Sequence, residues 1–192
     1  MNQMNLKAVI RRKRKRYKPC NPQTIAENEL NREFQENEAN KKWLTDVTEF
    51  QLKNGSKVYL SAIYDLGTGK IVSHVLGTSN NNKLVFETFN KAVNSVSSTE
   101  GIIFHSDRGF QYTSRLFKNM LKQNNMIQSM SRIGRCIDNG PMEGFWGIIK
   151  SEIYRGYKKF KFENIAEAFQ VINEYIAFFN NERITLKMAN LA

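Results

Sequence analysis

The chain has 192 residues, enough for one domain with extensions. Hydrophobic residues make up 41% and charged residues 24% of the sequence, which excludes a wholly disordered chain. The net charge is +11, and two cysteines and two histidines are too few for a disulfide framework or a zinc module. No apolar run approaches the ~18 residues of a membrane helix, and the basic start lacks the apolar stretch of a secretory signal. We therefore expect a cytoplasmic protein without a membrane partner.

Positive charge is concentrated in a basic arm, residues 1–20, which contains eight Lys or Arg residues and no acid. The arm leaves a net charge of only +3 for the rest of the chain. A run of consecutive cations repels itself and usually contacts nucleic-acid phosphates, although a solvated tail is the simpler alternative. The run consists of Arg11, Arg12, Lys13, Arg14, Lys15 and Arg16.

The region after the arm predicts a linker and then a three-stranded meander. Residues 21–40 are rich in Asn and Glu and contain few apolar residues, which indicates a linker with some helical tendency. Three segments rich in β-branched and aromatic residues follow, with short Gly-containing turns between them. The predicted strands are 42–52, 57–66 and 70–76.

The rest of the chain alternates between helical and extended patterns. A segment with apolar residues on one helical face precedes each of two short apolar strands. Strands reached through helical crossovers should lie parallel to the first strand, so we expect a mixed five-stranded sheet with helices on its faces. In chain order the segments are helix 81–97, strand 101–105, helix 113–124, strand 126–130, loop 131–140, a helix opened by Pro141 through about residue 154, and helix 163–182.

Three acidic residues stand out by their placement. Asp46 lies in the middle of the first predicted strand, where acids are uncommon, with an outward-facing edge position as the alternative. Asp107 closely follows a buried strand, where ligand sites collect in α/β sheets, although a turn-capping role is equally open. Glu143 lies in the first turn of a helix, where the helix dipole alone would favour an acid.

These three carboxylates would converge if the first and fourth strands were neighbours in the sheet. Their mutual repulsion would then call for cations. Ligand sets made only of oxygen atoms are typical of Mg²⁺ or Mn²⁺. Two such ions suit the displacement of a phosphodiester, so the sequence predicts a two-metal site at Asp46, Asp107 and Glu143.

The helix that carries Glu143 also predicts a surface for phosphates. Gly147 and Lys150 lie four and seven residues after Glu143, on one face of the helix. Gly147 leaves room for a backbone to approach closely, with helix packing in the core as its alternative role. Lys150 is a candidate phosphate contact, with an ordinary solvated lysine as the alternative.

Four sequence blocks carry a resemblance to a known family, and they read WLTDVTEF, HSDRGFQYTS, SMSRIGRCIDNGPMEGFWGIIKSE and FFNNERI. With them the chain closely resembles the catalytic (OrfB) protein of insertion-sequence transposases of the IS3 family. It is similar, more widely, to the integrase core shared with retroviral integrases. The resemblance runs from about residue 40 to residue 187.

The resemblance implies a ribonuclease-H-like α/β fold and a DDE triad with two Mg²⁺ ions, used for cutting and joining DNA strands. On the matching positions the triad becomes Asp46, Asp107 and Glu143, and Lys150 matches the family's downstream lysine. Lys150, Arg108 and the basic arm are then expected to contact DNA, both the element ends and the target duplex. A homo-oligomer that works on DNA at the nucleoid is also implied.

The resemblance divides the chain into two regions. Residues 1–40 would be the arm and linker, a remnant of an N-terminal DNA-binding region, and residues 41–192 the catalytic core. Family members usually have a helix-turn-helix before the core and a further segment after it, so both ends are expected to be truncated. Besides an active transposase, two alternatives stay open. One is a non-mobile DNA-binding remnant that inhibits a full-length transposase by mixed assembly. The other is a ribonuclease H, which the spacing of Glu143 and Lys150 disfavours.

Overall fold

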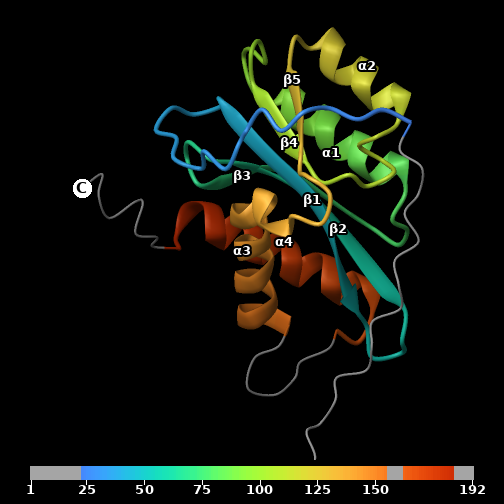
Figure 1. Ribbon diagram of the computed structural model, residues 1–192. Coiled ribbons are helices and arrows are strands. Elements are labelled where there is room, and N and C mark those ends of the chain that lie inside the picture. Colours follow the sequence, from blue (N-terminus) through green and yellow to red (C-terminus); the bar gives the residue numbers. More distant parts are fainter. Residues whose placement is uncertain (1–22, 155–161, 184–192) are drawn as a thin grey trace, which may run out of the picture.

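The computed structural model describes residues 23–154 and 162–183, and its element order follows the predicted one (Figure 1). Strands and helices begin and end within a few residues of their predicted limits. The helices are α1 (Asn82–Asn94), α2 (Arg115–Gln123), α3 (Gly140–Ile149) and α4 (Ile165–Asn181).

A mixed five-stranded sheet forms the centre of the fold. Strands β1 (Lys42–Gln51), β2 (Lys57–Asp65) and β3 (Lys70–Gly77) pair antiparallel as a meander. Strand β4 (Ile103–Ser106) pairs parallel with β1, and β5 (Ile127–Met130) pairs parallel with β4. The strand order is β3-β2-β1-β4-β5, which confirms the predicted mixed sheet and its helical crossovers.

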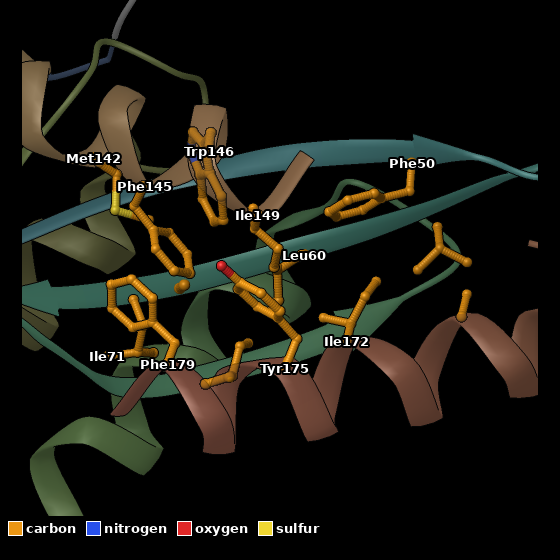
Figure 2. Packing of buried hydrophobic residues seen from close by; sticks show 14 of the residues in the cluster. Phe50, Leu60, Ile71, Met142, Phe145, Trp146, Ile149, Ile172, Tyr175 and Phe179 are labelled. Atoms are coloured by element: carbon orange, nitrogen blue, oxygen red, sulfur yellow. The ribbon is translucent and has the colours of Figure 1, made fainter. Parts of the chain in front are cut away.

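Helices cover both faces of this sheet and enclose two apolar clusters (Figure 1). Alternate residues of β1 point to opposite faces, so Trp43 joins the cluster under α1 and α2, and Leu44 joins the cluster under α3 and α4. Figure 2 shows Phe145 of α3 and Phe179 of α4 meeting in the second cluster, with ring centroids 4.8 Å apart. This packing fixes α3 against the face of β1 on which Asp46 lies.

Residues 23–40 differ from the prediction. They form turns and extended segments, so the helical tendency expected there was wrong. The backbone N–H of Met130 on β5 donates to the carbonyl of Glu27 (3.0 Å), and Leu30 is buried in the core at 1% exposure. This segment therefore covers the edge of β5, which would otherwise present unpaired backbone groups. The boundary at residue 40 stays a prediction.

The helix expected over 141–154 is also interrupted. Regular α3 ends at Ile149, and a π-helical turn follows over Lys150–Tyr154. The predicted loop 131–140 contains a 3-10 turn, Cys136–Asn139, immediately before α3. In the described part of the chain, no helix combines the length and apolarity needed to cross a membrane.

Candidate active site

Strands β1 and β4 bring two of the predicted acids to the same level of the sheet. Leu44 pairs with His105 in the parallel ladder, and Asp46 and Asp107 each lie two residues further along. Because side chains alternate along a strand, Asp46 shares the face of Leu44, which is the face that α3 covers. Strand β4 ends at Ser106, so Asp107 stands at the carboxyl end of a parallel strand, as predicted.

The Asp46 carboxylate is held by two hydrogen bonds from different elements. The backbone N–H of Val47 donates to Oδ1 (2.7 Å), and the indole Nε1–H of Trp146 on α3 donates to Oδ2 (3.0 Å). Burial chiefly raises the pKa of Asp46, to about 7, and the charge of Asp107 and more weakly that of Glu143 add to the rise. The two hydrogen bonds act in the opposite direction. The three acids therefore already interact in the fold.

Asp107 is set in a tight turn. Its Oδ1 accepts a hydrogen bond from the backbone N–H of Gly109 (2.7 Å), so the turn-capping role is real and coexists with the site. Burial among neighbouring atoms raises the pKa of Asp107, and the Gly109 bond opposes that rise, while the residue keeps solvent access at the surface. A Cβ at Gly109 would lie 2.9 Å from that same oxygen, so a side chain there would push the carboxylate away.

The buried Tyr112 is also affected by the charges of Asp46 and Asp107. Tyr112 is 1% exposed, and its hydroxyl lies 3.2 Å from Thr45 Oγ1. Burial first, and then the charges of Asp46 and Asp107, hold the pKa of Tyr112 well above its ordinary value. The phenol of Tyr112 consequently stays neutral, so it adds no negative charge near Asp46 and Asp107.

Glu143 lies in the first turn of α3 and is exposed. The turn before α3 is tied to β1, because Asn139 Nδ2 donates to the carbonyl of Thr45 (3.1 Å). One turn after Glu143, Trp146 is tied to Asp46. Contacts to β1 on both sides of Glu143 therefore hold the helical turn that carries this acid next to Thr45 and Asp46, in the middle of β1.

The donor set suits hard cations, because all three residues offer carboxylate oxygens only. Asp46 and Asp107 are close enough to raise the pKa of Asp46, which is the repulsion that a bound cation would relieve. Across residues 23–154 and 162–183, no three Asp, Glu, His or Cys side chains are close enough as they stand to ligate a common ion.

Residues predicted to contact DNA have other partners in the structure. Arg108 Nε donates to the carbonyl of Ser131 (2.8 Å), which ties the Asp107 turn to the loop after β5. Lys150 begins the π-helical turn, with its Nζ 5.6 Å from the centroid of the Phe50 ring. The DNA contacts of Arg108 and Lys150 stay predictions. Residues Arg11 to Arg16 lie outside the described residues.

Gly147 behaves as a surface position. It is exposed, and a Cβ built on it meets no heavy atom of the described residues within 4 Å. The alternative role in core packing is therefore excluded. Gly144 is equally open, so the side of α3 next to Glu143 presents bare backbone.

Two contributors to the site were not predicted, Trp146 and Asp138. Trp146 lies one turn after Glu143. Since a buried tryptophan normally finds a partner for its N–H, its place next to a candidate acid is the sequence signal that could have identified it. Asp138 has no side-chain exposure and anchors the loop that leads into α3. It accepts hydrogen bonds from Arg132 Nε (2.9 Å) and Arg32 Nε (2.7 Å), and these bonds hold its pKa well below the usual range.

Loss of the Asp138 charge is expected to destabilise the fold. Asp138→Asn keeps the volume but weakens the bonds from both arginines, which are 38% and 47% exposed and can turn to water. We expect a loss of about 2 kcal/mol, below the 3–5 kcal/mol of a fully buried pair. Thermal unfolding measures it, with Arg32→Gln as the milder control because Arg132 keeps its bonds to Asp138. Equal melting temperatures for wild type and Asp138→Asn would contradict this role.

Metal-free stability should depend on pH through Asp46. The pKa is about 7 in the fold against 3.8 ordinarily, so the folded state binds more protons between these values. Stability therefore falls as pH rises from about 4 to about 7, and the full penalty persists above that range. Mg²⁺ should restore stability at about pH 8 by binding the ionised cluster. Melting curves with and without Mg²⁺ at about pH 5 and pH 8 check this, and Asp46→Asn should flatten the profile.

Comparisons with known proteins agree with this geometry. A family model described as an integrase core domain matches residues 36–136, and a second with the same description matches residues 143–191. The InsK protein of insertion sequence element IS150 from Escherichia coli is 39% identical over 191 residues, covering all of this chain and 66% of InsK. A transposase-like protein of Haemophilus influenzae is 39% identical over 168 residues, 88% of this chain and 76% of that protein.

Among solved structures, the HTLV-2 integrase catalytic core in complex with magnesium superimposes with a TM-score of 0.58. It is 18% identical and covers 77% of this chain and 91% of that one. The sheet order and the flanking helices thus define a ribonuclease-H-like integrase core. Within that class, the chain belongs to the IS3 family of insertion-sequence transposases. It spans about two thirds of the length of InsK.

Proposed function

We propose that this chain is the catalytic core of a transposase that cuts DNA strands and joins them to a target duplex. The main support is the position of Asp46 in β1, beside the carboxyl end of β4, where the charges of both Asp107 and Glu143 act on it. Membership of the integrase core family supports a catalytic role for these acids. The protein would act in the cytoplasm, on nucleoid DNA, as a homo-oligomer.

Two Mg²⁺ or Mn²⁺ ions, when bound, would supply an activated oxygen nucleophile and charge neutralisation at the phosphate. Asp46 and Asp107 would hold one ion between them, and Glu143 would hold the second. Water first attacks a phosphodiester, and the broken P–O bond leaves a 3′-hydroxyl on the DNA. That hydroxyl would then attack a target phosphodiester in line, without a covalent bond to the protein. The new P–O bond forms as the bond to the 3′ oxygen of the target strand breaks; the attacking hydroxyl loses its proton and the leaving oxygen takes one up. Arg108 and Lys150 would contact the DNA phosphates.

Cleavage of DNA that flanks the coding region tests this proposal, because an insertion sequence carries its ends there. Labelled duplexes are incubated with the full chain and Mg²⁺ or Mn²⁺, with EDTA as the control. We expect metal-dependent strand cleavage that exposes a 3′-hydroxyl, followed by joined products. Binding without cleavage, together with inhibition of a full-length relative, would support the non-catalytic remnant instead. Preferential cleavage of RNA–DNA hybrids would support a ribonuclease H.

The basic arm is expected to supply much of the DNA affinity. Deleting residues 1–20 removes eight positive charges from a net charge of +11. If about six of them meet phosphates, the slope of log K against log salt should flatten by about 5. Fluorescence anisotropy over a range of salt concentrations measures the slope. An unchanged slope would identify the arm as a solvated tail.

A further inference from the structure

We propose that Trp146 is a positioning residue for the metal-binding carboxylates, through its hydrogen bond to Asp46. The inference rests on the proposed function, since it concerns the same site. It assigns the indole two tasks. The first is to orient the Asp46 carboxylate, and the second is to set the distance between α3, which carries Glu143, and β1, which carries Asp46.

The hydrogen bonds of Asp46 leave it able to bind a cation. Trp146 Nε1–H donates to Oδ2 (3.0 Å), and the Val47 N–H donates to Oδ1 (2.7 Å). A carboxylate has about four lone-pair positions, so each oxygen retains one. The indole is neutral, so it orients the carboxylate without cancelling the charge that attracts a cation. An Arg or Lys in its place would compete with the ion.

The surrounding packing makes Trp146 a rigid donor. It is 6% exposed, and its ring centroid lies 5.0 Å from that of Phe145. Figure 2 shows Trp146 beside β1, on the same helix as Phe145 and Ile149, which point into the buried layer above α4. An indole confined in this way cannot follow a carboxylate that rotates, so the carboxylate stays where the indole holds it.

The position of Trp146 along α3 supports the second task. Asn139, four residues before Glu143, donates to the carbonyl of Thr45, and Trp146, three residues after Glu143, donates to Asp46. The two bonds reach consecutive residues of β1 from either side of Glu143. Removing the second bond would leave α3 held to β1 by the Asn139 bond at its N-cap and by apolar packing, which fixes the distance between Glu143 and Asp46 less precisely.

If Trp146 had only a structural role, its replacement would lower stability without a specific effect on metal binding. The chain offers a matched control for this alternative. Trp43 is the other tryptophan, has no exposed surface, and donates its Nε1–H to Asn40 Oδ1 (3.1 Å) in the opposite apolar cluster. Trp43→Phe and Trp146→Phe each remove one indole donor and keep an aromatic ring. Both are expected to lower the melting temperature, whereas only Trp146→Phe should weaken metal binding.

The experiment measures Mn²⁺ affinity by electron paramagnetic resonance of the free ion, without DNA. Loss of a group that orients a metal ligand typically costs 10–100-fold in affinity, so we expect at least about a tenfold weaker Kd for Trp146→Phe. Trp43→Phe should stay within about twofold of wild type. Equal Mn²⁺ affinities for the two variants would overturn the positioning role.

A second measurement needs no variant of Trp146 and covers the case in which Trp146→Phe does not fold. In ¹H–¹⁵N spectra of the wild-type chain, the two indole N–H resonances are assigned with Trp43→Phe. Mg²⁺ should shift the Trp146 resonance and not that of Trp43, and Asp46→Asn should abolish the shift. An unmoved Trp146 resonance at saturating Mg²⁺ would overturn the inference. Intact Mn²⁺ binding without DNA cleavage would instead count against the proposed function alone.

Discussion

Asp46→Asn and Asp107→Asn are each expected to abolish metal-dependent DNA nicking while the fold is kept. Each change removes a ligand charge and preserves side-chain volume. A metal ligand contributes several kcal/mol of transition-state stabilisation, and each 1.36 kcal/mol is a factor of ten in rate. We therefore expect cleavage to fall by about three orders of magnitude. Gel assays with a labelled duplex measure this loss.

The same substitutions should not destabilise the metal-free protein. At about pH 8 the fold holds Asp46 ionised against its raised pKa, next to the charge of Asp107. A neutral side chain at either position removes that repulsion, so the melting temperature should stay equal or rise. Glu49→Gln is a control on the same strand, because Glu49 is exposed and pairs only with Lys57 among the described residues (2.8 Å). Full cleavage by either Asn variant would refute the assignment of these acids.

Local sequence patterns were sufficient for the architecture, because each element carries its own signal. The Gly-containing turns at 54–55 and 67–69 predict the meander, and the helical spacing after residue 80 predicts the crossovers. Once the strand order is known, the parallel register of β1 and β4 predicts that Asp46 and Asp107 lie at the same level of the sheet. Asp46 and Asp107 accordingly lie at one level of the sheet, where β4 ends beside the middle of β1.

Features that depend on tertiary contacts escaped prediction. Leu116 and Ile165 fit the apolar spacing of their helices, yet they are 65% and 40% exposed in the part of the chain that the structure describes. Residues 23–40 look like a polar linker, but hydrogen bonds to β5 and the single buried Leu30 hold them in place. No local sequence pattern predicts such a contact, since the partner strand lies about 100 residues further along the chain.

The prediction for Lys150 depends on helical spacing. Lys150 was placed on the face of Glu143 by assuming a regular helix through residue 154. The backbone N–H of Lys150 still donates to the carbonyl of Trp146, so the π-helical turn changes the angle per residue only beyond this lysine. The Nζ of Lys150 lies 5.6 Å from the centroid of the Phe50 ring, and its contact with DNA stays a prediction. Gly147 precedes this change, so its placement on the Glu143 face holds.

Gly147→Leu is expected to separate stability from strand transfer. Among the described residues, a Cβ at this exposed position meets no heavy atom within 4 Å, so a leucine is expected to extend into solvent. Replacing a helical glycine also removes its unfavourable propensity, worth up to about 1 kcal/mol. The melting temperature should therefore stay equal or rise.

Strand transfer should nevertheless be impaired in Gly147→Leu. Gly147 and Gly144 leave bare helix backbone beside Glu143, which is where a phosphate backbone must approach if Glu143 acts on it. A leucine side chain would hold the DNA away by several ångströms, and a misplacement of about 1 Å can already cost about 100-fold in rate. Ala166→Leu adds similar bulk at an exposed position of α4 and should leave strand transfer unchanged. Normal strand transfer by a stable Gly147→Leu protein would mean that DNA does not approach this side of α3.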